Sequence, residues 1–161
     1  GGIHWGTATD GTRVFAPMND RGGPTPEEPL AGPGLHALDI NTGNVLWSHK
    51  AQGDCSGDRK QRFPMCDTRL GYSPAPLVVD GAVVQGSIDG ILRVFDGATG
   101  ATLWSYDTMR KFDTVNGVAG NGGSIDSSPY VAANGTLFVT SGYARFGEAP
   151  GNVLLAFRKR P

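Results

Sequence analysis

Apolar residues occur along the chain in short runs, and turn-forming residues separate the runs. Asp-Gly or Asn-Gly stands between two such runs at three places: 10–11, 80–81 and 134–135. This dipeptide between short apolar segments is a strong signal for a tight β-hairpin. A further apolar run follows each hairpin, at 35–38, 91–95 and 153–157. Short strands and turn signals at this density predict an all-β protein.

A motif of the form Asp-x-x-Thr-Gly-x-x-x-Trp follows the first two of these apolar runs. Its positions are Asp39, Thr42, Gly43 and Trp47 in the first copy, and Asp96, Thr99, Gly100 and Trp104 in the second. The glycine suits a turn position with positive φ, and the aspartate can accept backbone N–H bonds across the turn. The tryptophan offers a large flat surface for the gap between adjacent repeats. We expect the motif to dock neighbouring repeats on one another.

Hairpin, apolar strand and tryptophan strand together make a four-stranded repeat, which is the composition of a β-propeller blade. The repeats fall at about 1–49, 71–107 and 127–158, and the last lacks its fourth strand. We therefore predict a partial β-propeller of two complete four-stranded blades and a three-stranded last blade. The whole chain, 1–161, is expected to be the C-terminal part of one propeller domain. Its open flanks would need the remaining blades or a second chain to cover them.

The long connections join second to third strands and one blade to the next, at 19–34, 50–71, 107–127 and 142–151. Because strands alternate in direction, these connections fall on one face of the ring. Elaborated loops on a rigid scaffold commonly carry function, although such loops can also merely cover the blade ends. We expect the functional site on this face.

Charge and cysteine content narrow the setting. The formal net charge is −1 and no apolar run reaches the length of a membrane span, so neither nucleic acid nor a membrane is expected as a partner. Cys55 and Cys66 share one long loop around the basic stretch 59–62. We expect a disulfide and hence a periplasmic or secreted location, with two free thiols as the alternative. The basic stretch is expected to be the solvated tip of that loop.

Several segments carry a resemblance to a known family. The segment 37–47 resembles the tryptophan-docking motif of the dehydrogenases that use pyrroloquinoline quinone (PQQ), an eight-bladed propeller family. Resemblance to the polyvinyl-alcohol dehydrogenases extends over 55–66, 71–73, 121–126, 141–143 and 150–157. It implies oxidation of a primary or secondary alcohol, with polyvinyl alcohol as one candidate.

The resemblance also implies PQQ at the axis of an eight-bladed ring, a Ca²⁺ ion beside it, and an electron acceptor such as cytochrome c or a quinone. The same repeat occurs in non-catalytic propeller scaffolds, so a protein-interaction module is the alternative. The two classes differ at the ring axis, where only the enzyme needs a stacking aromatic side chain, cation ligands and a base.

Four residues are candidates for the quinone site, and each has a simpler structural alternative. By the resemblance, Trp5 would stack under the quinone, unless it is a core residue, and Asn19 would be a ligand of the cation, unless it serves a turn. Asp126 precedes the third inner strand and would bond quinone, cation or substrate, unless it caps a loop backbone. Arg145 would meet a carboxylate of the quinone, unless it is a solvated surface residue. The sequence assigns no catalytic base.

Overall fold

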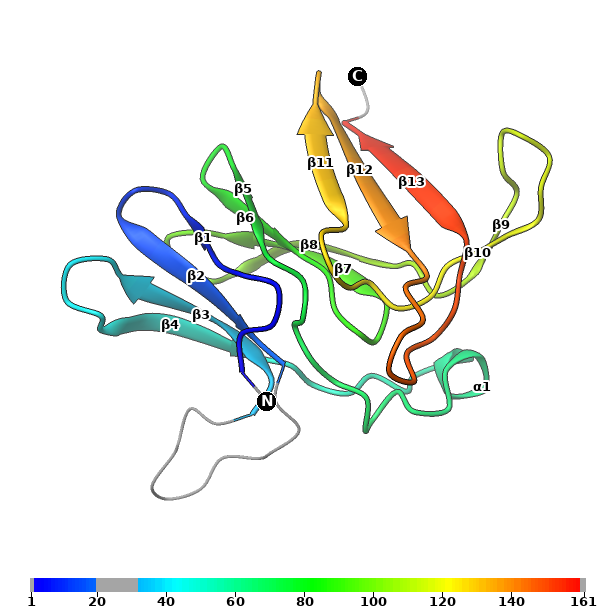
Figure 1. Cartoon of the computed structure of the whole chain (residues 1–161), viewed down its shortest axis with the longest axis horizontal. Helices are drawn as coiled ribbons and strands as arrows, with labels where there is room; N and C mark the ends of the chain where they lie inside the picture. The colour runs from blue at the N-terminus through cyan, green and yellow to red at the C-terminus, as the bar shows by residue number, and fades with distance from the viewer. Residues whose placement is uncertain (1, 20–31, 160–161) are drawn as a thin grey trace.

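Three antiparallel sheets stand side by side in the computed structural model, which describes residues 2–19 and 32–159 (Figure 1). Blade 1 has the strand order β1 (Ala8–Thr9), β2 (Arg13–Met18), β3 (Gly34–Asp39) and β4 (Val45–Lys50). Blade 2 consists of β5 (Leu77–Val79), β6 (Ala82–Gln85), β7 (Ile91–Asp96) and β8 (Thr102–Asp107). Blade 3 consists of β11 (Tyr130–Ala133), β12 (Thr136–Ser141) and β13 (Val153–Arg158). Sheets of four, four and three strands confirm the predicted partial propeller.

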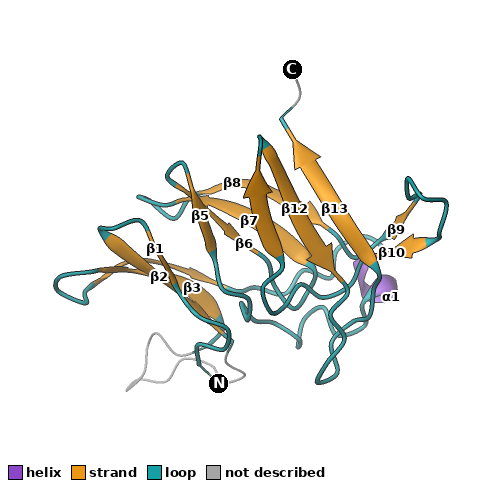
Figure 2. Ribbon diagram, turned by 45° about the horizontal axis from the view of Figure 1, so that its top comes forward, coloured by secondary structure: helices purple, strands orange, loops and turns teal. Residues whose placement is uncertain are grey.

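Two short elements interrupt the connections between blades (Figure 2). A single helical turn, α1 (Arg59–Arg62), lies between blades 1 and 2. A small hairpin of β9 (Lys111–Phe112) and β10 (Gly120–Asn121) projects between blades 2 and 3. Neither the helical turn nor this hairpin was predicted from the sequence. No helix among the described residues has the length and apolarity that crossing a membrane requires.

Two of the three predicted hairpins have the tight turn that an Asp-Gly or Asn-Gly pair favours. Asp80-Gly81 and Asn134-Gly135 have positive φ at both residues, from 48° to 76°, as a type I′ turn requires. In the first hairpin only Gly11 has positive φ. There the Asp10 carboxylate accepts bonds from the N–H groups of Thr12 and Arg13, at 2.9 and 2.7 Å. This hairpin therefore depends on a side-chain turn rather than on two left-handed residues.

Both copies of the docking motif adopt the same turn. The Asp39 carboxylate accepts bonds from the N–H and hydroxyl of Thr42, at 2.8 and 3.0 Å. The corresponding bonds from Thr99 to Asp96 are both 2.8 Å. Gly43 and Gly100 have φ of 71° and 73°. The aspartates thus accept bonds across the turn and the glycines have the positive φ that the motif indicates, and the threonine hydroxyls add a bond to the same carboxylates.

The motif also joins blade 1 to blade 2, as predicted. The Trp47 indole N–H donates to the carbonyl of Gly97 at 3.0 Å, and its ring covers Gly100 so closely that a Cβ there would lie 2.6 Å from it. Beneath this contact, side chains of both blades form one buried cluster: Phe15, Leu35, Ala37, Tyr72, Val83 and Phe95. Trp104 packs against Phe157 of blade 3 instead, with ring centroids 5.3 Å apart. Each tryptophan therefore contacts the following blade.

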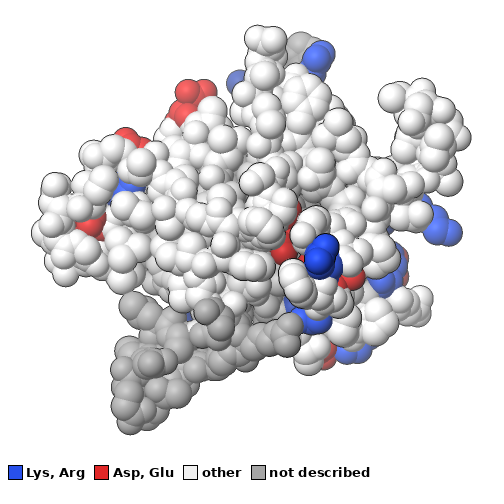
Figure 3. All heavy atoms as spheres, in the orientation of Figure 1, with Lys and Arg blue, Asp and Glu red and all other residues white. Residues whose placement is uncertain are grey.

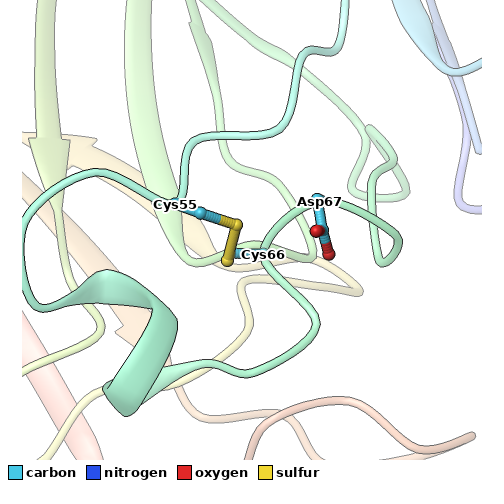
Figure 4. A group of neighbouring side chains, drawn as sticks. All are labelled: Cys55, Cys66 and Asp67. Carbon is cyan, nitrogen blue, oxygen red and sulfur yellow. A yellow bond between two sulfur atoms is a disulfide. The ribbon is translucent and has the colours of Figure 1, made fainter.

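The cysteine loop differs from the expectation in one respect. Cys55 and Cys66 form the expected disulfide, and the loop they close contains α1 (Figure 4). Arg59 is not solvated, because only 4% of it is exposed. Its guanidinium pairs with Asp107 at 2.8 Å and with Asp89 at 3.6 Å. The prediction of a solvated basic tip is wrong at this residue, because two carboxylates of blade 2 compensate its burial.

Candidate functional site

The long connections 50–71, 107–127 and 142–151 meet on one face of the three blades, whereas most of the predicted connection 19–34 lies outside the described residues. The carbonyl of Ser124, in the connection before blade 3, accepts bonds from the N–H groups of Gly142 and Tyr143 at 2.9 and 3.2 Å. The hydroxyl of Ser124 donates to the carbonyl of Ile88 in blade 2 at 2.6 Å. Between blades 1 and 2, the N–H of Tyr72 donates to the carbonyl of Met18 at 3.2 Å. These bonds between loops of different blades give the face a fixed shape.

A cavity of about 260 Å³ opens on this face, and all three blades contribute to its wall. The lining residues are His4, Asn19, Thr68, Arg69, Leu70, Ile88, Phe146 and Glu148. They combine a guanidinium, a carboxyl, an imidazole and an amide with apolar groups. Most ligand sites have this composition, with a few polar groups on an apolar wall.

Two predicted residues lie at the blade 1 side of the cavity. Asn19 lines it, and the Asn19 side chain fills the space beside Gly71 so closely that a Cβ on Gly71 would overlap it. Trp5 is 42% exposed and contacts the ring of His4, with centroids 5.0 Å apart. His4 is held in turn by Ser73, whose hydroxyl lies 2.8 Å from Nδ1. Trp5 is therefore exposed beside His4 without lining the cavity itself, and its stacking role stays a prediction.

The third predicted residue, Asp126, lies behind the cavity beside Glu148. It is 3% exposed, and its Oδ1 accepts a bond from the N–H of Ser127 at 2.6 Å. Its Oδ2 has no hydrogen-bond partner among the described residues, and neither has Glu148 Oε2. Burial, as the largest cause, and the charge of the neighbouring Asp126 raise the pKa of Glu148 to about 7. Asp126 therefore caps its own loop, as the alternative holds, and also controls a neighbouring carboxyl group.

Arg69 is the cation of the site, and it was not among the predicted residues. Its guanidinium donates to the carbonyl of Phe146 at 2.6 Å, which ties the cysteine loop to the β12–β13 loop. Its charge opposes the rise of the Glu148 pKa. Arg145, the predicted cation, is exposed; its guanidinium lies 5.7 Å from the Phe146 ring centroid and outside the cavity lining. Arg69 could have been suspected from the sequence, because it lies between the segments 55–66 and 71–73 that resemble polyvinyl-alcohol dehydrogenases. No motif in the sequence around Glu148 points to a functional role.

Among the described residues, carboxylates do not gather around Asn19. Among all the described residues, one group of three side chains has potential metal-binding atoms close together: Cys55, Cys66 and Asp67 (Figure 4). Both sulfurs of this group belong to the disulfide, and Asp67 pairs with Lys60 at 3.0 Å. A Ca²⁺ ion needs six to eight oxygen ligands. The described residues therefore do not form a calcium site by themselves, and Asn19 could be only one ligand of a site completed by other residues.

A quinone that carries carboxylates fits the same wall better. Arg69 of the lining offers a charged donor for a carboxylate or a quinone oxygen, and the exposed ring of Trp5 lies next to His4 of the same wall. Positive and negative side chains are interspersed on the visible surface, so no large field of one sign covers this view (Figure 3). Recognition of an anion would therefore depend on local groups such as Arg69.

The docked blades and their tight turns define this chain as part of a β-propeller. A family profile described as outer membrane protein assembly factor BamB matches residues 1–124. The chain belongs to this family of PQQ-type β-propeller repeats.

Individual relatives include both enzymes and an assembly factor. The chain is 37% identical to polyvinylalcohol dehydrogenase from Sphingopyxis sp. (strain 113P3), over 98% of the chain and 25% of that protein. Its fold resembles a europium-containing methanol dehydrogenase, with a TM-score of 0.56 and 18% identity over 97% of the chain and 30% of the other. Its fold also resembles BamB from Moraxella catarrhalis, with a TM-score of 0.55 and 19% identity over 94% of the chain and 32% of that protein. The chain thus spans about a quarter of the polyvinylalcohol dehydrogenases it matches.

Proposed function

We propose that this chain forms part of a PQQ-dependent alcohol dehydrogenase that oxidises a primary or secondary alcohol, with polyvinyl alcohol as the first substrate to test. The similarity to polyvinylalcohol dehydrogenase over nearly the whole chain carries this proposal. The cavity supports it, because three blades bring a guanidinium, a carboxyl group and an amide together on one partly apolar wall. The disulfide agrees with a periplasmic or secreted location.

Bound PQQ would supply the two-electron acceptor for the alcohol, and the protein would bind and orient both. Trp5 would pack against the flat ring system and Arg69 would hold an anionic group. Asn19 would present its amide oxygen to a cation that carboxylates from other blades complete. Arg145 stays a prediction for a quinone carboxylate, and Arg69 is the better placed of the two arginines because it lines the cavity.

The proposed partners follow from the same chemistry. Electrons taken from the alcohol must leave the site, so an external acceptor such as cytochrome c or a quinone is required. The remaining blades, or a second chain, would cover the open flanks and complete the cavity.

Titration of PQQ with Ca²⁺ into the natural protein, followed by absorbance and fluorescence, tests the proposal. Loss of a charge-assisted hydrogen bond in Arg69→Gln should weaken binding about 10- to 100-fold. Arg110→Gln is the matched control, because Arg110 is exposed and lies over the Tyr106 ring at 5.1 Å, away from the cavity. Equal loss in both variants, or no binding to the unmodified protein, would contradict the proposal.

A scaffold that binds other proteins is the second candidate, because the matching family profile is described as an assembly factor. A scaffold requires no quinone. Absence of PQQ binding in a correctly folded natural protein would therefore favour this candidate.

A further inference from the structure

A bulky apolar residue has an unfavourable backbone conformation beside the cavity. Phe146 has a φ of 58° and Gly147 a φ of 83°, and the N–H of Glu148 donates to the carbonyl of Arg145 at 3.3 Å. Residues 145–148 therefore form a tight turn with positive φ at both central positions, as in type I′. Asparagine, aspartate and glycine suit the first of these positions, whereas a bulky residue there is an outlier. Local backbone preference therefore does not explain the phenylalanine.

Contacts among the described residues do not explain Phe146 either. It is 65% exposed, although the Arg145 guanidinium lies 5.7 Å from its ring centroid. The turn is fixed instead by Arg69, which donates to the Phe146 carbonyl at 2.6 Å and whose Nη2 would lie 2.5 Å from a Cβ on Gly147. These contacts involve the backbone of the turn and do not need the phenyl ring. An outlier that neither the turn nor the packing requires points to a function.

Phe146 belongs to the apolar part of the cavity wall, together with Leu70 and Ile88. Ile88 is buried and Leu70 is half-buried, so Phe146 is the most exposed apolar side chain of the lining. Its ring therefore lies at the rim of the cavity. Polar groups of the lining, such as Arg69 and Asn19, can bind a hydroxyl or an anionic group, whereas the apolar groups need hydrocarbon. The wall thus fits a ligand that is polar at one end and carries a hydrocarbon chain.

We propose that Phe146 is a specificity-determining residue of the dehydrogenase and that its ring packs against the hydrocarbon chain of the alcohol. This inference rests on the proposed function. Burial of one methylene group changes an equilibrium constant about fourfold. An alcohol with a chain of several carbons gains from this contact, as does the hydrocarbon backbone of polyvinyl alcohol. Methanol and ethanol have little chain to bury, and sugars carry a hydroxyl on nearly every carbon. The site should therefore favour long-chain alcohols over both.

The first test measures binding without turnover. Ethanol, butanol and hexanol are titrated into the natural protein before any quinone is added, and ligand-observed NMR gives each dissociation constant. Fluorine NMR of 4-fluorophenylalanine labels reports the contact, with the Phe146 resonance assigned by its loss in Phe146→Asn. Asparagine suits the left-handed region, so this variant removes the ring and keeps the turn.

We expect hexanol to shift the Phe146 resonance and the dissociation constant to fall about two- to fourfold for each added methylene. In Phe146→Asn the dissociation constant should fall less steeply with chain length. An unshifted Phe146 resonance at saturating hexanol would overturn the inference.

The second test measures turnover of the quinone-loaded natural protein. The ratio of kcat/KM for hexanol to that for ethanol should drop about 10- to 60-fold in Phe146→Asn, because the contact of several methylenes is lost. Val115→Asn is the matched control and should keep the ratio, because Val115 is a fully exposed apolar residue of the β9–β10 hairpin, outside the cavity lining. Thermal unfolding should show Phe146→Asn to be at least as stable as the unmodified protein, which excludes misfolding as the cause.

The outcomes separate this inference from the proposed function. An unchanged ratio in Phe146→Asn, with the unmodified protein active, would overturn the role of Phe146 alone. If the quinone-loaded protein oxidises none of the alcohols while hexanol still shifts the Phe146 resonance, the proposed function fails and the apolar contact stands.

Discussion

Single side chains decide how the blades of this protein meet. Trp47 reaches 50 residues along the chain to donate to the Gly97 carbonyl, and its ring leaves no room for a side chain at Gly100. Gly43 occupies the equivalent position in blade 1, with nearly the same φ. Nothing lies within 4 Å of a Cβ built on Gly43. The two glycines therefore share a backbone requirement and differ in their packing.

This difference gives a matched pair of substitutions. Gly43→Ala should cost about 1–2 kcal/mol, because alanine is strained in the left-handed region. Gly100→Ala should cost about 1–3 kcal/mol more, because its methyl group also displaces Trp47. Urea denaturation of both variants measures the difference. Equal costs would show that the Trp47 contact does not constrain this turn.

Aspartates of the docking turns link stability to pH. The bonds from Thr42 lower the pKa of Asp39, and those from Thr99 lower the pKa of Asp96. A lowered pKa in the folded state means that these carboxylates stabilise the fold above their ordinary pKa of 3.8. This stabilisation is lost as the pH falls through the lower, folded-state pKa.

We therefore expect Asp39→Asn to weaken the dependence of stability on pH below about 4, where the change in charge is removed. Unfolding curves recorded from pH 2 to 7 measure this, and Asp96→Asn serves as an independent repeat in blade 2. An unchanged acid dependence in both variants would contradict the assigned role of the turn.

At the scale of elements, the sequence predicts structure that depends on residues close together in the chain, and it does not predict contacts between residues far apart in the chain. The hairpin at Asp80-Gly81 and the two docking turns are set by residues a few positions apart, and all three were predicted from the pattern. Arg59 was assigned to solvent because its partners, Asp89 and Asp107, lie 30 and 48 positions away and only the fold brings them near. Glu148 was missed for the same reason. Local chemistry thus predicts the strands, whereas the wall of the cavity depends on contacts between blades.

Arg59 and its neighbour Lys60 test how α1 is held. Arg59→Ala removes one of the two arginines that pair with each carboxylate, because Arg93 still faces Asp89 at 3.7 Å and Arg62 still faces Asp107 at 3.0 Å. It should cost about 1–3 kcal/mol, the range for lost hydrogen bonds to a charged group. Lys60→Ala removes only an exposed pair with Asp67 and should cost at most about 1 kcal/mol. Urea denaturation compares the two. A cost no larger than that of Lys60→Ala would mean that the disulfide and the bonds of Arg62 to Asp107 and Met109 hold the loop without Arg59.

At the scale of the whole molecule, the two faces of blade 3 differ. Val139, Leu137 and Phe157 belong to the cluster shared with blade 2. Val131 and Leu154 lie on the opposite face and are 61% and 66% exposed. An apolar sheet face of this kind is covered in a propeller by the next blade. The exposed face therefore agrees with a ring larger than three blades.

One substitution can test whether another blade covers this face, because it should have opposite effects in the 161-residue chain and in a longer natural protein. In the 161-residue chain alone, Leu154→Glu should reduce self-association, because it places a charge on an exposed apolar face. In a longer natural protein whose next blade covers Leu154, the same change should cost several kcal/mol, about what an unpaired buried charge costs. Size-exclusion chromatography of the chain and denaturation of the longer protein measure the two effects. If the longer protein tolerates the charge, no blade packs on this face, and the ring must close in another way.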